Sequence, residues 1–352
     1  MILSVADRRL VPVPPTPRPR TTAHPTTDPA DGDDDQRAGS MVWARGLRKS
    51  YPSTGSGQRG DVEADRGIDL DDRPGESFGF LGPNGAGKSS TMRMVAAVSP
   101  PSGGELSILG LDPATHGPEI RARLGVCPLE DTLDLELNIR ENLLVYASYF
   151  GIRKAEAASR ADELLEFVQL TEKAKAKVVD LSGGMKRRLT IARSLINNPD
   201  VLLLDEPTTG LDPQARHLLW DRLFRLKQRG VTLVLTTHYM DEAEQLCDRL
   251  VVMDGGAIVA QGSPLELIRE HSTREVAELR FGVGEHEALA EKIEDLGDRV
   301  EVLPDRLLVY SDRGEDVVTA VLDRGLHPIA TLVRRSTLED VFLRLTGRSL
   351  AD

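Results

Sequence analysis

The chain has 352 residues, of which 40% are hydrophobic, so it can bury a core and has room for more than one domain. Its net charge of −12 argues against a general nucleic-acid binder, which would normally carry a basic face. Two isolated cysteines, Cys127 and Cys247, are too few for a disulfide framework or a zinc site and fit a reducing cytosolic setting. No apolar run approaches the roughly 20 residues that span a bilayer, so work at a membrane would require a partner.

Residues 1–40 carry seven of the chain's 21 prolines and an acidic run at 31–35. With few bulky apolar residues this segment cannot offset its ordering entropy, so we expect it to be disordered. Met41 precedes the first strand-like residues and is an alternative start of translation. Residues 52–60 are rich in serine and glycine and predict an exposed loop.

Residues 78–262 alternate between strand, turn and helix. The runs 201–204 and 231–235 are short, apolar and flanked by helical patterns, which is typical of strands covered on both faces in a mostly parallel sheet. Residues 214–229 have helical periodicity between them. The region of about 111–190 is rich in helix formers and predicts a helical subdomain.

Residues 264–352 predict a small separate α+β domain. Its expected strands are 275–281, 299–303, 306–310 and 328–333, and its expected helices are 287–296, 315–324 and 337–345. The resulting βαββαβ order with a final helix is compatible with a ferredoxin-like module. Ser336 followed by Glu339 predicts a capping box at the last helix.

A phosphate-binding loop follows the strand-like residues 77–81 and opens the helical run 90–98. It matches G-x-x-x-x-G-K-[ST] with Gly82, Pro83, Asn84, Gly85, Ala86, Gly87, Lys88 and Ser89. The glycines let backbone N–H groups turn inward around an anion, and the helix N-terminus adds partial positive charge. Lys88 is expected to reach the β- and γ-phosphates of ATP, and the Ser89 hydroxyl to bind Mg²⁺.

Two carboxylates follow the buried strand 201–204. Asp205 lies where a Mg²⁺ ligand is needed, at the carboxyl end of a strand beside the phosphate loop. Glu206 is placed to orient or deprotonate the attacking water, a contribution of about 10²–10⁴ in rate.

A second helix begins after Ser182, Gly183 and Gly184. Its small hydroxyl and two glycines expose N–H groups as the phosphate loop does, although alone they would also suit an ordinary helix cap. We interpret the following Lys186, Arg187 and Arg188 as a solvated helix face.

These motifs, with 210–213 and 236–238, occur in the order found in ATP-binding-cassette (ABC) ATPases, which the chain resembles over about residues 42–262. The resemblance implies a P-loop α/β cassette at 41–263, with a mostly parallel sheet core, an antiparallel β part and the helical subdomain. It also implies a homodimer, or a heterodimer of cassettes, that sandwiches ATP between one chain's phosphate loop, including Ser90, and the other chain's Ser182–Gly184.

The resemblance assigns three more residues. It implies that His238 contacts the γ-phosphate, Asp212 couples the two sites and Tyr51 stacks on adenine. A structural histidine at a strand end is the alternative for His238. For Tyr51 the adjoining loop leaves the alignment open.

A narrower likeness is to the nodulation-type lipo-oligosaccharide exporter ATPases and related drug-resistance ATPases. It rests on Met185, residues 140–144, residues 215–217 and the ending 338–342. It implies an ATP-hydrolysing subunit at the cytoplasmic face of the cell membrane. A separate integral-membrane permease would then export a lipid-like, oligosaccharide or drug-like substrate.

One segment departs from the family. Residues 125–131 place Leu129 where these ATPases have a glutamine that contributes an oxygen to Mg²⁺ and the attacking water. Either Glu130 substitutes, or the metal depends on Ser89 and Asp205 alone. Leu129 therefore leaves open a regulatory ATP-binding protein with weak hydrolysis. A second alternative, independent of Leu129, is a soluble ABC ATPase acting on ribosomes or DNA. The single cassette, with about 93 residues between Lys88 and Ser182, disfavours the soluble ATPase.

Overall fold

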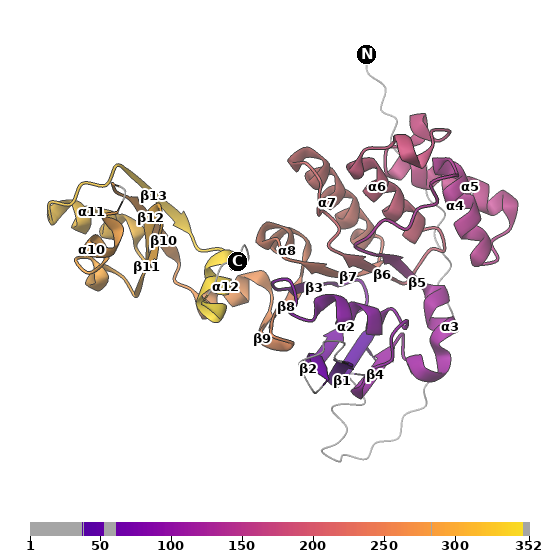
Figure 1. Ribbon diagram of the computed structural model, residues 1–352, viewed down its shortest axis with the longest axis horizontal. Helices are drawn as coiled ribbons and strands as arrows, with labels where there is room; N and C mark the ends of the chain where they lie inside the picture. Colours follow the sequence, from indigo (N-terminus) through magenta and orange to yellow (C-terminus); the bar gives the residue numbers. More distant parts are fainter. Residues whose placement is uncertain (1–36, 38, 53–60, 283, 348–352) are drawn as a thin grey trace.

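The computed structural model describes residues 37, 39–52, 61–282 and 284–347. The disorder predicted for residues 1–40 and the loop predicted at 52–60 therefore lie largely outside the described residues. Within the described part, three sheets organise the chain, and a smaller module extends from a larger cassette (Figure 1).

The central sheet has the strand order β5-β6-β7-β3-β8-β9, with only the β8–β9 pair antiparallel. All residues of β3 and β7 are buried, as expected of strands covered on both faces. Leu81 pairs with Thr237 and Asp205 with Thr236, so the ends of three strands meet at one edge. The strands are β3 (Ser77–Leu81), β5 (Leu124–Cys127), β6 (Val201–Asp205), β7 (Thr232–Thr237), β8 (Arg249–Asp254) and β9 (Ala257–Gly262).

A second, antiparallel sheet has the order β2-β1-β4, formed by β1 (Val42–Tyr51), β2 (Val62–Asp72) and β4 (Gly103–Ile108). Helix α2 (Lys88–Val95) contacts both sheets, and its buried methionines share one core with side chains from each. This sheet is the antiparallel part that the family resemblance implied.

Most helices between β4 and β6 build a lobe on one side of the sheet, whereas the first of them, α3, lies apart from the lobe and contacts β4 and β5 (Figure 1). Three of them share a core of their own, and α4 begins with a capping box formed by Asn138 and Glu141. These helices lie within the region of about 111–190 for which the sequence predicted a helical subdomain. Its elements are α3 (Pro113–Arg123), α4 (Ile139–Tyr149), α5 (Lys154–Phe167), η1 (Thr171–Lys173), η2 (Val178–Asp180) and α6 (Gly183–Ser194), and α7 (Pro213–Gln228) and α8 (Met240–Leu246) follow β6 and β7.

The smaller module is an antiparallel sheet with the order β13-β10-β12-β11 and helices on one face. Its elements are β10 (Glu275–Arg280), α10 (His286–Ala290), η3 (Glu294–Leu296), β11 (Arg299–Leu303), β12 (Arg306–Ser311), α11 (Gly314–Asp323) and β13 (Ala330–Arg335). This βαββαβ arrangement is the ferredoxin-like one that the sequence suggested.

Two helices at the ends of this module pack into the cassette instead. Buried side chains of α9 (Pro264–His271) and α12 (Leu338–Thr346) belong to the same core cluster as α7, α8 and β8. The last helix therefore connects the two parts of the chain.

The predicted cap of that last helix was wrong by one residue. Thr337 is the N-cap of α12, and Asp340 accepts hydrogen bonds from the Thr337 N–H at 2.8 Å and hydroxyl at 3.2 Å. Ser336 instead accepts a hydrogen bond from the Ser272 hydroxyl. Ser336 with Glu339 and Thr337 with Asp340 both fit the spacing of a capping box. The second pair forms the cap, and Asp340 is also held by hydrogen bonds from Arg334.

Candidate active site

The phosphate loop closes tightly on its own surroundings. Gly87 has a φ of 105°, and a Cβ there would lie 2.6 Å from the Ala64 carbonyl oxygen and from Asp65 Oδ1. A Cβ on Gly82 would lie 2.4 Å from the Met253 carbonyl oxygen. Glycine is required at both positions because only it fits the backbone conformation or the space. Helix α2 begins directly afterwards, with the Ser90 N–H bonded to Gly87.

Lys88 is buried and turned across the loop. Its Nζ donates to the carbonyl oxygens of Gly82 at 2.6 Å and Pro83 at 2.9 Å. Burial lowers the pKa of Lys88, while the nearby Glu206 and Asp205 oppose that shift. The only cation among the loop's own residues, Gly82–Ser89, is thus held at the phosphate-binding turn.

Asp205 faces the start of α2 across the sheet edge. Its Oδ1 lies 3.4 Å from Ser89 Oγ and also accepts a hydrogen bond from Thr236 Oγ1. Hydroxyl and carboxylate oxygens are ligands that suit Mg²⁺, which usually takes one or two protein ligands beside phosphate oxygens and water. The two residues assigned to the metal are therefore adjacent and have fitting chemistry.

Glu206 and His238 converge beside Asp205. Glu206 Oε2 accepts a hydrogen bond from Thr209 Oγ1 at 3.0 Å and lies 3.2 Å from His238 Nδ1, an ion-pair distance without hydrogen-bond geometry. Glu206 has a φ of 45°, uncommon for a non-glycine residue, and its N–H bonds to Thr236. The structure thus fixes an unusual backbone turn that aims this carboxylate at His238.

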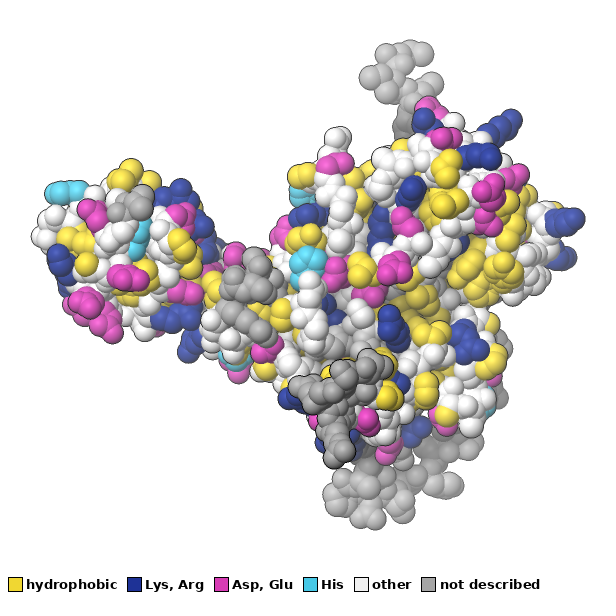
Figure 2. Space-filling model, in the orientation of Figure 1, with side chains coloured by type: hydrophobic (Ala, Val, Ile, Leu, Met, Phe, Trp, Pro, Cys, Tyr) yellow, Lys and Arg dark blue, Asp and Glu magenta, His cyan; other side chains and the backbone are white. Residues whose placement is uncertain are grey.

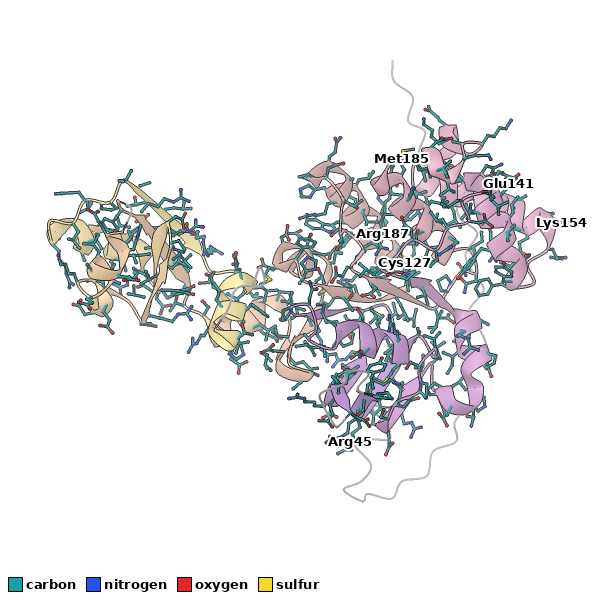
Figure 3. The ribbon with its side chains drawn as sticks, viewed as in Figure 1. Arg45, Cys127, Glu141, Lys154, Met185 and Arg187 are labelled. Carbon is teal, nitrogen blue, oxygen red and sulfur yellow. The ribbon has the colours of Figure 1, made fainter. Side chains whose placement is uncertain are left out.

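Arg187 is not on a solvated helix face, so that interpretation was wrong. It is buried, at the position labelled in Figure 3. Its guanidinium donates to the carbonyl oxygens of Asp205, Glu206 and Pro207 and to that of Pro128. One side chain thereby holds the backbone of the two catalytic candidates and of the segment after β5. The planar five-donor guanidinium suits this arrangement. The signal was its spacing, because Arg187, Ile191 and Ser194 all lie on the buried face of α6.

The turn Ser182–Gly184 opens α6, and Asp212 opens α7. Ser182 Oγ accepts from the Met185 N–H at 3.3 Å, and Asp212 Oδ1 accepts from the Ala215 N–H at 2.9 Å. A Cβ on Gly183 would meet nothing within 4 Å. Among the described residues, no hydrogen bond joins this turn to the phosphate loop, so the chain does not bring its two glycine turns together through such contacts.

Tyr51 ends β1 beside the undescribed residues 53–60. Its ring centre lies 5.1 Å from the Lys49 ammonium group, and its buried hydroxyl has no hydrogen-bond partner among the residues that the structure describes. These contacts neither place it against a base nor exclude that role, so its contact with adenine stays a prediction.

A groove of about 1110 Å³ runs from the catalytic edge to the helical lobe. Ser89 and Asp205 line one end with Leu129, which is 46% exposed, and Glu130. Tyr149 of α4 lines the groove as well. Figure 2 shows hydrophobic side chains gathered on this side of the molecule. Leu129 therefore lies where the sequence placed it, beside the metal-ligand candidates, without a polar group to offer them.

The fold and these residues define a P-loop nucleoside triphosphatase. Comparisons with known proteins narrow that class. A family model described as ABC transporter matches residues 66–209, and the C-terminal domain of the nodulation factor export protein NodI matches residues 286–347.

Relatives and solved structures agree with this. Nod factor export ATP-binding protein I of Cupriavidus metallidurans is 44% identical over 313 residues, covering 89% of this chain and 99% of the relative. The protein of that name from Rhizobium meliloti is 48% identical over 293 residues, covering 83% and 86%. A dimeric ATP-binding cassette bound to ADP and Pi matches with a TM-score of 0.59 and 27% identity, covering 63% of this chain and 98% of that one.

The chain belongs to the ABC transporter ATPase family, and it binds and hydrolyses ATP. Among the described residues, none of the helices has the length and apolar character needed to cross a membrane.

Proposed function

We propose that this chain is the ATPase subunit of an exporter, acting at the cytoplasmic face of the cell membrane beneath a separate permease. The observation that carries the catalytic part is the convergence of Ser89, Asp205, Glu206 and His238 at the edge where β3, β6 and β7 end. The likeness to Nod factor export proteins, over cassette and C-terminal module alike, supports export of a lipid-like or oligosaccharide substrate.

In this proposal each side chain has one task in ATP hydrolysis. The phosphate loop and Lys88 hold the phosphates, and Glu206 accepts the proton of the attacking water while His238 contacts the γ-phosphate. Ser89 and Asp205 would hold Mg²⁺, whose charge offsets that of the phosphates. Arg187 fixes the backbone of Asp205 and Glu206, so that both carboxylates stay aimed as the reaction proceeds.

A second cassette completes the site in this account. Gly183 has open space in front of it, so nothing in the described part of the chain requires a glycine there. A close approach from outside would require it, and the N-terminus of α6 presents N–H groups to an anion. We therefore propose that Ser182–Gly184 of one chain closes on ATP held by another chain, with Asp212 near the contact.

The groove is the proposed docking site of the permease. Its wall includes Val98, 64% exposed, and Tyr149, 75% exposed, and exposed apolar side chains on a concave surface are typical of an interaction site. Since Leu129 and Asp205 line its other end, a partner seated there would lie next to the catalytic edge.

Cross-linking in the native membrane tests this. A cysteine placed at Val98 or Tyr149 and labelled with a photoreactive maleimide should attach to an integral-membrane protein, whereas one at the exposed Val62, which does not line the groove, should not. The native Cys127 and Cys247 are buried, and burial raises the pKa of both thiols, so they should not compete. Equal labelling from all three positions, or none from the groove, would rule out this docking site.

A further inference from the structure

Helix α8 directly follows the catalytic edge. Only the N-cap residue Tyr239 separates His238 from Met240, the first residue of α8. The ring centres of His238 and Tyr239 lie 4.1 Å apart. Because a helix moves as a rigid element, the placement of α8 sets the placement of His238 relative to Glu206. Contacts that fix the position of α8 therefore also influence the position of His238 at the catalytic edge.

One side chain of α8 binds the chain's last helix. Glu244 Oε1 accepts a hydrogen bond from the backbone N–H of Leu338, the first residue of α12, at 2.7 Å. Burial raises the pKa of Glu244, and the Leu338 N–H opposes that shift. A carboxylate at a helix N-terminus also interacts favourably with the helix dipole. The two helices are thus joined by a directional polar contact.

An apolar face of α12 strengthens this junction. Leu338, Val341 and Phe342 are fully buried and lie in the same core cluster as Leu246 of α8. Burial of such side chains contributes about 1.5–3 kcal/mol each. The position of α12 therefore constrains α8 through packing as well as through Glu244.

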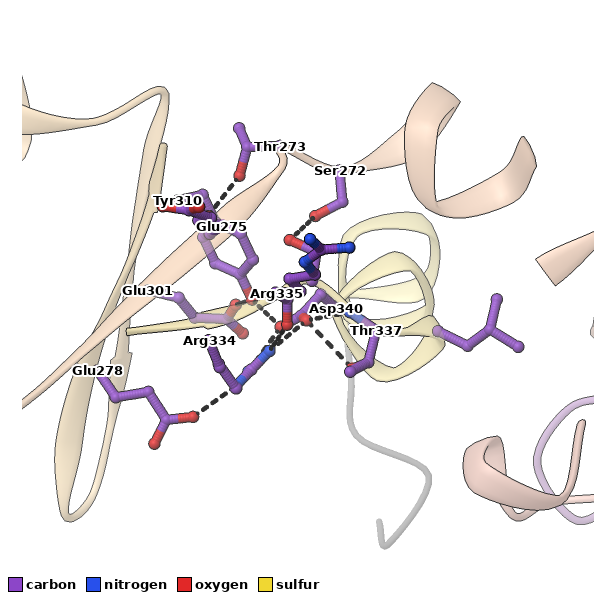
Figure 4. Close-up of polar contacts among 12 residues, drawn as sticks. Ser272, Thr273, Glu275, Glu278, Glu301, Tyr310, Arg334, Arg335, Thr337 and Asp340 are labelled. Carbon is purple, nitrogen blue, oxygen red and sulfur yellow. Dashed lines mark hydrogen bonds and ion pairs between the residues drawn. The ribbon is translucent and has the colours of Figure 1, made fainter. Parts of the chain in front are cut away.

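The opposite side of α12 is fixed to the ferredoxin-like sheet (Figure 4). Asp340 is 1% exposed and accepts from Arg334 of β13 at 2.7 and 3.0 Å and from the Tyr310 hydroxyl of β12 at 3.1 Å. Arg334 also donates to Glu278 of β10 at 2.6 Å. A buried carboxylate held by several hydrogen bonds has one allowed position, and removing one partner would be strongly destabilising.

We infer that the C-terminal module positions His238 for ATP hydrolysis through α12, with Glu244 as the positioning residue on α8. The chain of contacts runs from the sheet through Arg334 and Asp340 to α12, and from Leu338 through Glu244 to α8. The inference rests on the proposed role of His238. It assigns to the module an effect on turnover and not on ATP binding, because among the described residues no hydrogen bond or ion pair joins the module to the phosphate loop.

Substitution of Glu244 tests the inference. Glu244→Leu removes the acceptor while filling the space, and kcat should fall about tenfold with ATP affinity within about twofold of the parent, since a misplacement of about 1 Å at a catalytic group can reduce the rate by as much as 10²-fold. Glu244→Gln keeps an oxygen acceptor and should restore most of the rate. Glu156→Leu is the matched control, because it removes a surface ion pair with Arg160 on α5 and should change neither quantity.

A second variant keeps the test decisive if Glu244→Leu folds poorly. Arg334→Gln breaks the ion pair between β13 and Asp340 of α12 but leaves Asp340 its hydrogen bonds from Tyr310 and Thr337, and it should lower kcat about threefold without changing ATP affinity. If both variants alter melting temperature only and leave kcat within about twofold, the contacts are structural and the inference is wrong. His238→Ala separates the two failures: unchanged turnover in that variant would overturn the proposed role of His238 itself.

Discussion

The phosphate loop and the turn Ser182–Gly184 are two glycine-rich helix starts with opposite surroundings. At Gly82 and Gly87 an added Cβ would lie 2.4 to 2.6 Å from backbone or carboxylate oxygens of the same chain. At Gly183 it would meet nothing within 4 Å. The first turn needs its glycines in order to fold, whereas the second has no such need within one chain.

The difference separates binding from turnover. In the first turn, the residues that hold phosphate are already positioned by contacts within the chain, such as the hydrogen bonds from Lys88 to the loop carbonyls. The second turn exposes its N–H groups and is completed only by an outside partner, in our account a second cassette. Changes in the first region should therefore affect folding and ATP affinity, and changes in the second should affect turnover alone.

Gly183→Asp should give the largest effect. A carboxylate in the first turn of a helix favours the helix by about 0.3–1 kcal/mol, so the melting temperature should be unchanged or slightly raised. The same charge would repel the γ-phosphate of ATP held by a second chain, so turnover should fall at least about 100-fold while ATP affinity stays within about twofold. Calorimetric ATP binding and steady-state hydrolysis measure both.

Gly87→Ala is the corresponding substitution in the phosphate loop. It should lose ATP binding and stability together, because the new Cβ meets the backbone of β2. A Gly183→Asp chain that still hydrolyses ATP at the parent rate would contradict the contrast between the two turns.

Leu129→Gln tests the catalytic edge between them. If the missing amide oxygen limits metal and water placement, turnover should rise roughly five- to a hundredfold while ATP affinity barely changes, because this oxygen matters as charge develops in the transition state. If Glu130 already fills the role, Glu130→Ala will instead be the damaging change. Hydrolysis assays on both variants distinguish the cases. If neither variant changes the rate of hydrolysis, this segment has no part in catalysis, and weak hydrolysis by the chain would then have another cause.

Asp65→Asn should leave turnover nearly unchanged and alter stability with pH. Asp65 is buried against Gly87, accepts a hydrogen bond from Thr91 at 2.9 Å, and has its pKa raised by burial from 3.8 to about 6. The native state thus binds this proton more tightly than the unfolded chain, so the contribution of Asp65 to the free energy of unfolding falls by about 3 kcal/mol as pH rises from below 4 to above 6.

The asparagine variant lacks this penalty. It should be more stable than the parent at pH 8, with the gain fading by pH 4, whereas exposed Asp61→Asn should show little difference at either pH. Denaturant unfolding at the two pH values measures the effect. A gain that does not depend on pH would mean that Asp65 is not the titrating group.

The sequence predicted contiguous features well and dispersed ones poorly. The phosphate loop, Asp205 and Glu206 lie in short motifs, so the sequence predicted that they meet at one edge of the sheet, and the structure places them there. Arg187 was misread because its neighbours are charged, which masked its spacing from Ile191 and Ser194 on the buried face of α6. Its partners are backbone carbonyls of residues 58 to 59 and 18 to 20 positions away, which no local pattern reveals.

The C-terminal module follows the same division. Short runs of apolar residues predicted its strands to within a few residues, because apolar side chains of these strands pack against the helices on one face of the sheet. The cap at Thr337 and the joint role of α12 depend on Arg334, Asp340 and Glu244, which come together only in three dimensions. The sequence indicated a separate domain but contained no local signal that its last helix returns to the cassette core.

The state of assembly of a Glu206→Gln chain tests the central claim most directly. The isosteric amide removes the base but leaves the phosphate loop and Asp205 intact, so ATP should bind without turnover and keep two chains closed on each other. Size-exclusion chromatography with light scattering, in ATP and Mg²⁺, should give twice the mass of one chain, and adding Gly183→Asp should return the monomer. A Glu206→Gln chain that stays monomeric while saturated with ATP would contradict the account.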